Sequence, residues 1–146
     1  MVPRIGVATL TLACVILFAG TLLWPTAAAS DGALAMGMPQ DLGKDGFSFG
    51  IKIKAATMEE ARDEALRACR TSTAAESKAR SLCTVVRTFR GECAAIAMDP
   101  EPGKSGTGWG VGKDEEAAKS AAMKMCAETA NRGRQSFCQV DRVACD

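Results

Sequence analysis

The feature that most limits the fold of this chain is an internal repeat. Residues 33–36 read A-L-A-M, and residues 95–98 read A-I-A-M. A glycine-flanked aromatic side chain follows each copy, Phe49 in the first and Trp109 in the second. Self-similarity of this kind indicates one structural unit used twice, with Phe49 and Trp109 in matching positions.

Cysteines mark the same repeat. The chain of 146 residues has seven cysteines, and six of them follow residue 30. Those six align as three pairs of counterparts: Cys69 with Cys126, Cys83 with Cys138, and Cys93 with Cys145. We therefore expect residues 30–146 to form a single domain built from two repeats, at about residues 33–93 and 95–145.

Each repeat is predicted to contain two strands, a helix and a third strand. Thr57 with Glu60 three residues later is a capping box, and Asp114 is an acidic N-cap for the second helix. Alanine and cysteine return every three to four positions after each cap, which indicates an apolar helical face. Short β-rich runs predict strands at 47–53, 83–89, 107–111 and 137–143. The predicted fold class is α+β, a duplicated ββαβ unit with antiparallel sheet, two helices packed on one side, and disulfide bonds.

The amino terminus has the pattern of an export signal. An uncharged, mainly apolar run at 5–24 follows a single arginine, and Ala27 and Ala29 are the small residues that signal peptidase accepts. Residues 1–29 are therefore predicted to be a signal peptide cleaved near Ala29, which makes the domain periplasmic or secreted. Two alternatives stay open: the apolar run is long enough to remain as a membrane anchor, or Cys14 is lipidated.

Removal of residues 1–29 leaves an even number of cysteines in an oxidising compartment, which favours three disulfides. Six cysteines allow 15 pairings, and the spacing alone does not choose among them. The repeat favours a symmetric scheme: Cys69–Cys83, Cys126–Cys138, and Cys93–Cys145 as a bridge between the repeats. Neither the paired spacing of a zinc site nor a C-x-x-C redox motif occurs, so we expect no metal.

Composition and motifs argue against the familiar activities. The chain has no histidine, which excludes histidine-based triads and histidine metal ligands. The net charge of +1 gives no field for nucleic acid. Gly103-Lys104-Ser105 lacks the earlier glycine of a phosphate-binding loop, so we expect neither nucleotide nor other cofactor.

Two sets of residues remain as candidates for a site. Trp109 and Phe49 are either aromatic anchors on a binding surface or part of the core. A second hypothesis is an enzyme of unfamiliar type acting on cell-wall or secreted substrates. That hypothesis requires convergence of Asp99, Glu92, Arg87 and Arg142 near the strand ends.

The order of these elements resembles a known family. An apolar leader, A-[LI]-A-M, a G-[WF]-G strand, an E-E-A helix ending in cysteine and paired later cysteines resemble the small exported bacterial proteins of domain of unknown function 4189. The resemblance covers residues 33–145 and implies export and this domain without an activity. Because familiar catalytic motifs are lacking and disulfides stiffen a duplicated scaffold, we expect a non-enzymatic binding or interaction module whose partner is another protein or an envelope component. An inhibitor or immunity protein is a further alternative, and a membrane is expected to contact the chain only if residues 5–24 are retained.

Overall fold

A computed structural model describes residues 30–146 of the chain. The predicted signal peptide, the alternative anchor and Cys14 lie outside the described residues. The first half contains β1 (Asp31–Gly37), α1 (Leu42–Asp45), β2 (Ser48–Ala55), α2 (Met58–Thr71), α3 (Ser77–Ser81) and β3 (Thr84–Arg90). The second half contains β4 (Cys93–Met98), β5 (Thr107–Gly112), α4 (Glu115–Thr129), a 3₁₀ turn (Gln135–Phe137) and β6 (Gln139–Cys145).

The helices begin where the sequence predicts. The Thr57 hydroxyl accepts a hydrogen bond from the Glu60 N–H at 3.1 Å, and the Glu60 carboxylate accepts one from the Ala56 N–H at 3.0 Å. The Asp114 carboxylate accepts one from the Ala117 N–H at 2.9 Å. These side chains satisfy amide groups that the first turn of a helix leaves without partners.

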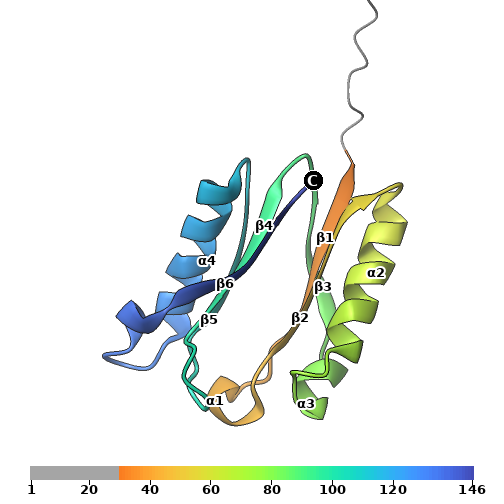
Figure 1. Cartoon of the computed structure of the whole chain (residues 1–146). Helices are drawn as coiled ribbons and strands as arrows, with labels where there is room; N and C mark the ends of the chain where they lie inside the picture. The colour runs from red at the N-terminus through yellow and green to blue at the C-terminus, as the bar shows by residue number, and fades with distance from the viewer. Residues whose placement is uncertain (1–29) are drawn as a thin grey trace, which may run out of the picture.

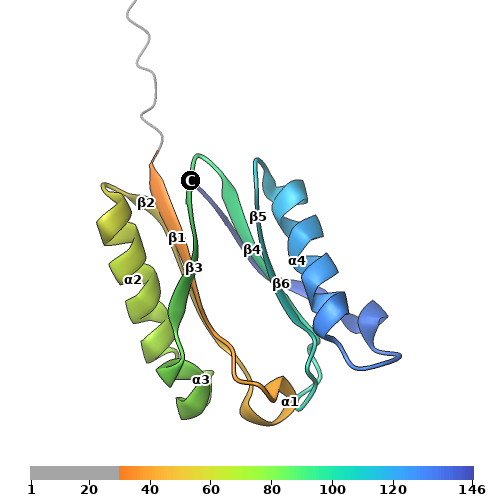
Figure 2. The same cartoon turned by 180° about the vertical axis from the view of Figure 1, so that it is seen from behind.

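The strands form two antiparallel sheets of three strands each, with the orders β2-β1-β3 and β5-β4-β6. The two halves share the order strand, strand, helix, strand (Figures 1 and 2). Helix α2 packs on the first sheet and α4 on the second. The α+β class and the antiparallel pairing are thereby confirmed.

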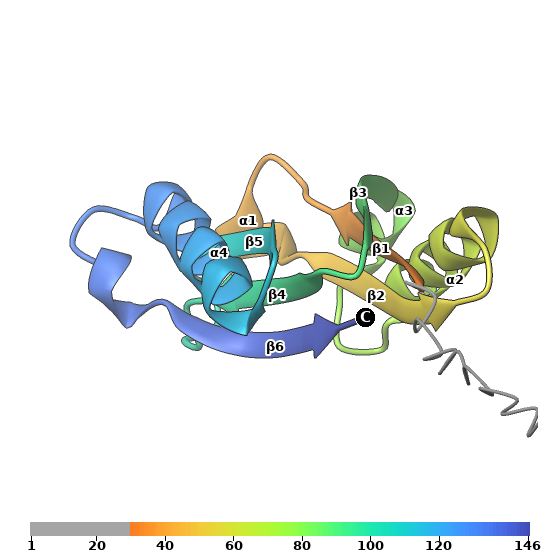
Figure 3. The same ribbon diagram turned by 90° about the horizontal axis from the view of Figure 1, so that it is seen from above.

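The layers run α2, first sheet, second sheet, α4, as the view from above shows (Figure 3). Each helix covers one side of its own sheet, so the two helices lie on opposite outer faces of the molecule. The sequence analysis places both helices on one side, and the structure differs because the central strands are apolar on both faces. Ala33 and Ala35 of β1 pack toward α2, whereas Leu34 and Met36 pack between the sheets.

Glycine lets the helices lie close on the sheets. A Cβ built on Gly50 lies 2.2 Å from the carbonyl oxygen of Ala65 in α2, and one built on Gly108 lies 2.2 Å from that of Ala122 in α4. Gly110 and Gly112 face the backbone of α4 in the same way. The glycines of β5 therefore serve helix packing, which explains their spacing of two residues along a strand.

The strand register corrects the predicted match between Phe49 and Trp109. Leu34 pairs with Ile51 in the first sheet, and Ile96 pairs with Trp109 in the second. Because Leu34 and Ile96 hold the same place in the A-[LI]-A-M motif, the counterpart of Trp109 is Ile51. The sequence alignment slipped by two residues, a shift that keeps every side chain on its face of the sheet.

The three disulfides are Cys69–Cys83, Cys126–Cys138 and Cys93–Cys145, the pairs that the repeat favoured. The first two join the end of a helix to the strand that follows. Cys93 and Cys145 lie opposite each other in β4 and β6, so their bond lies inside the second sheet and does not bridge the halves. The predicted repeat boundary at Cys93 is wrong because β4 begins there.

The register also shows that Cys93 and Cys145 are not counterparts of each other. Asp31 and Arg90 pair in the first sheet at the position that Cys93 and Cys145 hold in the second. The Arg90 Nε lies 2.6 Å from an oxygen of Asp31. An ion pair in one half therefore takes the place of a disulfide in the other.

Candidate functional site

Two hollows adjoin each other along the outer edge of β2. One has a volume of about 410 Å³ and the other about 650 Å³. Phe49, Ser72, Ala74 and Met98 line both of them. We call the combined depression the β2 groove.

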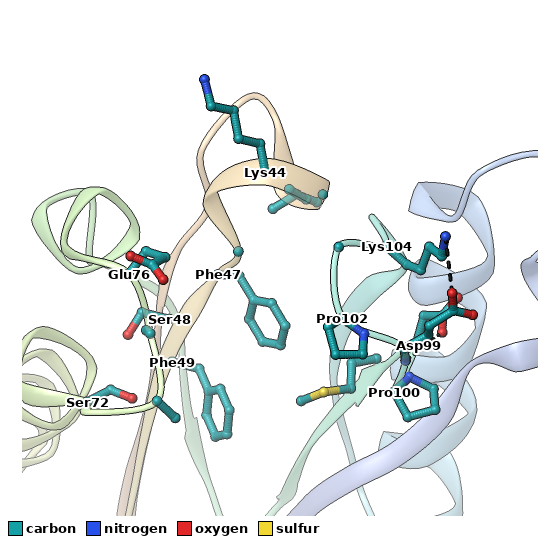
Figure 4. A pocket seen from close by; sticks show the side chains of 18 residues that line it. Lys44, Phe47, Ser48, Phe49, Ser72, Glu76, Asp99, Pro100, Pro102 and Lys104 are labelled. Atoms are coloured by element: carbon teal, nitrogen blue, oxygen red, sulfur yellow. Dashed lines mark hydrogen bonds and ion pairs between the residues drawn. The ribbon is translucent and has the colours of Figure 1, made fainter.

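Two apolar walls face each other across one end of the β2 groove. Phe49 belongs to β2 and Phe47 immediately precedes it, and their ring centroids are 6.1 Å apart. Pro100 and Pro102 lie opposite them (Figure 4). Met98, the last residue of β4, also lines this end of the groove. The side chain of Lys44 points away from this space (Figure 4). Aromatic and proline walls of this kind suit an apolar ligand better than a charged one.

A buried ion pair fixes the proline wall. Asp99 has a fully buried side chain, and its carboxylate accepts hydrogen bonds from Arg134 at 2.6 and 2.8 Å. The same carboxylate accepts one from the Glu101 N–H at 3.0 Å. Arg134 also lies 2.7 Å from a Glu101 oxygen and 4.1 Å from the centre of the Phe137 ring. Arg134 thus holds the segment that carries both prolines.

Hydrogen bonding from Arg134 lowers the pKa of the Asp99 carboxyl below its ordinary value of 3.8, against the opposing effect of burial. The reciprocal bond raises the pKa of Arg134. Because the folded-state pKa of Asp99 lies below its unfolded value, the pair stabilises the fold above pH 3.8. That contribution disappears as the pH falls through the lowered pKa.

Arg134→Gln is expected to destabilise the protein near neutral pH and to lose most of that deficit in acid. The variant leaves the Asp99 carboxylate buried without its guanidinium partner until protons neutralise it. Urea unfolding at pH 6 and pH 3 measures the difference between this variant and the wild type. Arg132→Gln is the matched control, since Arg132 is exposed and forms no ion pair with a described residue. A deficit that does not change with pH would contradict this assignment.

A smaller groove of about 340 Å³ lies along β5, on the opposite edge of the molecule. Trp109 lines it together with Arg87 of β3 and with Lys124, Met125 and Glu128 of α4. Trp109 is half-buried and also packs between the two sheets. Phe49 is half-buried as well and packs between the sheets, so each aromatic side chain belongs to the core and also lines a groove.

The residues named by the enzyme hypothesis lie apart. Arg87 lines the β5 groove, whereas Asp99 and Arg142 line two different parts of the β2 groove. Asp99 is paired with Arg134, and the backbone carbonyl of Glu92 accepts a hydrogen bond from the Asp146 N–H at 3.0 Å. The register shows that Arg87 and Arg142 are counterparts, because they pair with Leu34 and Ile96 respectively. Because Arg87 and Arg142 hold equivalent positions in the two halves, each lines a different groove, and the two grooves lie on opposite edges of the molecule.

Among residues 30–146, no cluster of three or more metal-ligating side chains occurs. No helix of the same residues is long and apolar enough to cross a membrane. The sequence analysis missed Ser72, Ala74 and the two prolines of the groove wall. They lie in connecting segments, where neither period nor motif marks a side chain as part of a site.

Fold and groove together define a small disulfide-bonded α+β protein with two stacked sheets and an apolar groove at one sheet edge. The chain belongs to the family "Domain of unknown function (DUF4189)", whose model matches residues 32–145. The NMR structure of Rv1813c from Mycobacterium tuberculosis is similar, with a TM-score of 0.46 and 16% sequence identity. That similarity covers 99% of this chain and 100% of the other. No curated protein matches the sequence.

Proposed function

We propose that this protein is an exported, non-enzymatic binding module that holds an apolar segment of a partner in the β2 groove. The observation that carries the proposal is the pair of facing walls, Phe47 and Phe49 on one side and the two prolines on the other. Half-buried aromatic side chains in a concave surface are the usual anchors of recognition. The partner is another protein or a component of the bacterial envelope.

The rigidity of the walls supports the same function. The Cys69–Cys83 bond holds the end of α2, from which Ser72 and Ala74 extend into the groove. The Arg134 clamp holds the opposite wall. A preformed groove loses little conformational entropy when a ligand enters, so more of the contact energy becomes affinity.

The disulfides suggest an oxidising, extracytoplasmic environment. We further propose that residues 1–29 are a signal peptide cleaved near Ala29, which releases the domain into the periplasm or the exterior. The intact mass of the exported protein reports its amino terminus. A mass that includes residues 5–24 would show a retained anchor instead.

Photo-crosslinking in the exporting cell tests the proposed groove. A photoreactive residue in place of the exposed Ala74, at the groove rim, is expected to form a covalent adduct with the partner. The same substitution at the exposed Arg132 is the control, because Arg132 lies outside the lining of the groove. Phe47→Ala with Phe49→Ala removes one wall and should abolish most of the adduct. Equal adducts at both positions, or none, would reject the proposal.

A further inference from the structure

Along the outer edge of β2, the backbone groups have side-chain hydrogen-bond partners at the end of the strand but not in its middle. β2 pairs only with β1, so every second residue of β2 directs its N–H and C=O away from the sheet. At the end of the strand these groups have partners: the Lys54 N–H donates to Asp146 at 2.7 Å, and the adjoining Ala56 N–H donates to Glu60 at 3.0 Å. Beside the groove, no described side chain accepts a hydrogen bond from the N–H of Phe49 or Ile51.

The second half shows what closes such an edge. The Trp109 N–H donates to the sulfur of Met125 at 3.4 Å, so it points away from β4, toward the free edge of β5. Ile51 holds the position of Trp109 in the register, and its N–H therefore points toward the β2 groove. The counterpart of Met125 is Ala68, one residue before the equivalent cysteine of α2, and a methyl group accepts no hydrogen bond.

We propose that the open edge of β2 binds an extended peptide segment of a partner protein as an added strand. This inference rests on the proposed function and names the partner of that site. Free strand edges pair with a peptide backbone, whose donors and acceptors repeat at the spacing of the sheet. An acyl chain fills an apolar groove but has no hydrogen-bond donor or acceptor for the C=O and N–H of Ile51. The unpaired edge therefore favours a peptide over a lipid.

The residues that line the groove determine which peptide side chains it can accommodate. Thr71, Ser72 and Thr73 lie at and just beyond the C-terminal end of α2, whereas Met98 and Ala144 contribute an apolar surface. Because neighbouring residues of a strand point to opposite sides, the peptide should alternate small polar and apolar residues.

Charge further limits the peptide. Asp141 and Arg142 are adjacent in β6, line the groove, and form no ion pair with a described residue. One charge of each sign matches a peptide without strong net charge. The affinity should therefore depend little on salt concentration.

The experiment uses the exported protein and a displayed library of random nine-residue peptides as the probe. Selected peptides are expected to alternate small polar and apolar residues. They should bind the wild type with one-to-one stoichiometry. Ala68→Met places a thioether where Met125 closes β5, and should weaken binding about tenfold through loss of hydrogen bonds at the edge. Ala68 is exposed on α2, and methionine is a good helix former, so the variant should fold. A thermal unfolding curve checks this.

Two further measurements separate added-strand binding from simple burial of side chains. Methylation of alternate backbone nitrogens in the selected peptide should weaken binding about tenfold in one register and little in the other. Met125→Ala should expose the β5 edge and allow a second peptide to bind, which calorimetry counts.

The outcomes distinguish the inference from the proposed function. If Phe47→Ala with Phe49→Ala abolishes binding while Ala68→Met and both methylated peptides bind normally, the groove is a binding site and the added strand is wrong. If the library yields no binder, or the photo-crosslinked adduct is a lipid, the peptide inference is overturned. Self-association of the purified protein that competes with the peptide would make a second copy of this chain the occupant, and would also overturn it.

Discussion

Gly108→Ala is expected to lower the free energy of unfolding by about 3 kcal/mol. The added Cβ lies 2.2 Å from the Ala122 carbonyl oxygen and 2.3 Å from the Cys126 nitrogen. Both are backbone atoms of α4, and Cys126 is bonded to Cys138. The helix must therefore move as a unit, because no side chain can rotate out of the way. Urea unfolding at pH 7 measures the loss.

Gly106→Ala, one residue before β5, is the matched control. Its Cβ lies 3.1 Å from the Cβ of Asp99 and 3.3 Å from that of Ala130, contacts that small movements relieve. The expected loss is under about 1 kcal/mol, partly offset by the lower entropy of the unfolded chain. Gly50→Ala, which meets the Ala65 carbonyl oxygen at 2.2 Å, should repeat the result in the first half. Equal losses at Gly106 and Gly108 would show that close helix approach is not what these glycines provide.

The local elements were predictable because their signals are local. Caps at Thr57 and Asp114 fix the start of each helix. The division into two sheets also has a signal in the sequence. In A-L-A-M and A-I-A-M, small residues alternate with large ones, and all of them are buried except Met98, which is half-buried. Such a strand needs a partner on each face, a close helix on the small side and a second sheet on the large side.

The register and the groove could not be predicted in the same way. Glycine recurs every second residue in β5, so an alignment that slips by two positions looks equally good and pairs Trp109 with the wrong counterpart. The groove requires both register and loop positions, since its walls come from the β4–β5 connection and the end of α2 as well as from β2. The difference between Ala68 and Met125 acquires meaning only after the two halves are superposed by register.

Asp31→Cys combined with Arg90→Cys is expected to form a fourth disulfide. These positions are paired across β1 and β3 as Cys93 and Cys145 are paired across β4 and β6. The second sheet thus shows that a disulfide fits this position of the unit. A link between the ends of the first half closes a loop of about 60 residues, and the chain-entropy model gives about 4 kcal/mol of stabilisation for such a loop.

The comparison that isolates the crosslink is with Asp31→Ala and Arg90→Ala, which removes the ion pair without adding a bond. The ion pair has an exposed arginine, so its loss should change stability little, whereas the new disulfide should raise it. Non-reducing peptide mass spectrometry identifies the new linkage between positions 31 and 90, and denaturant unfolding measures its effect. Free thiols at both positions would show that β1 and β3 do not have the geometry of β4 and β6. In that case the equivalence of the two halves, on which the assignment of Ala68 to the place of Met125 depends, would fail at this end of the sheet.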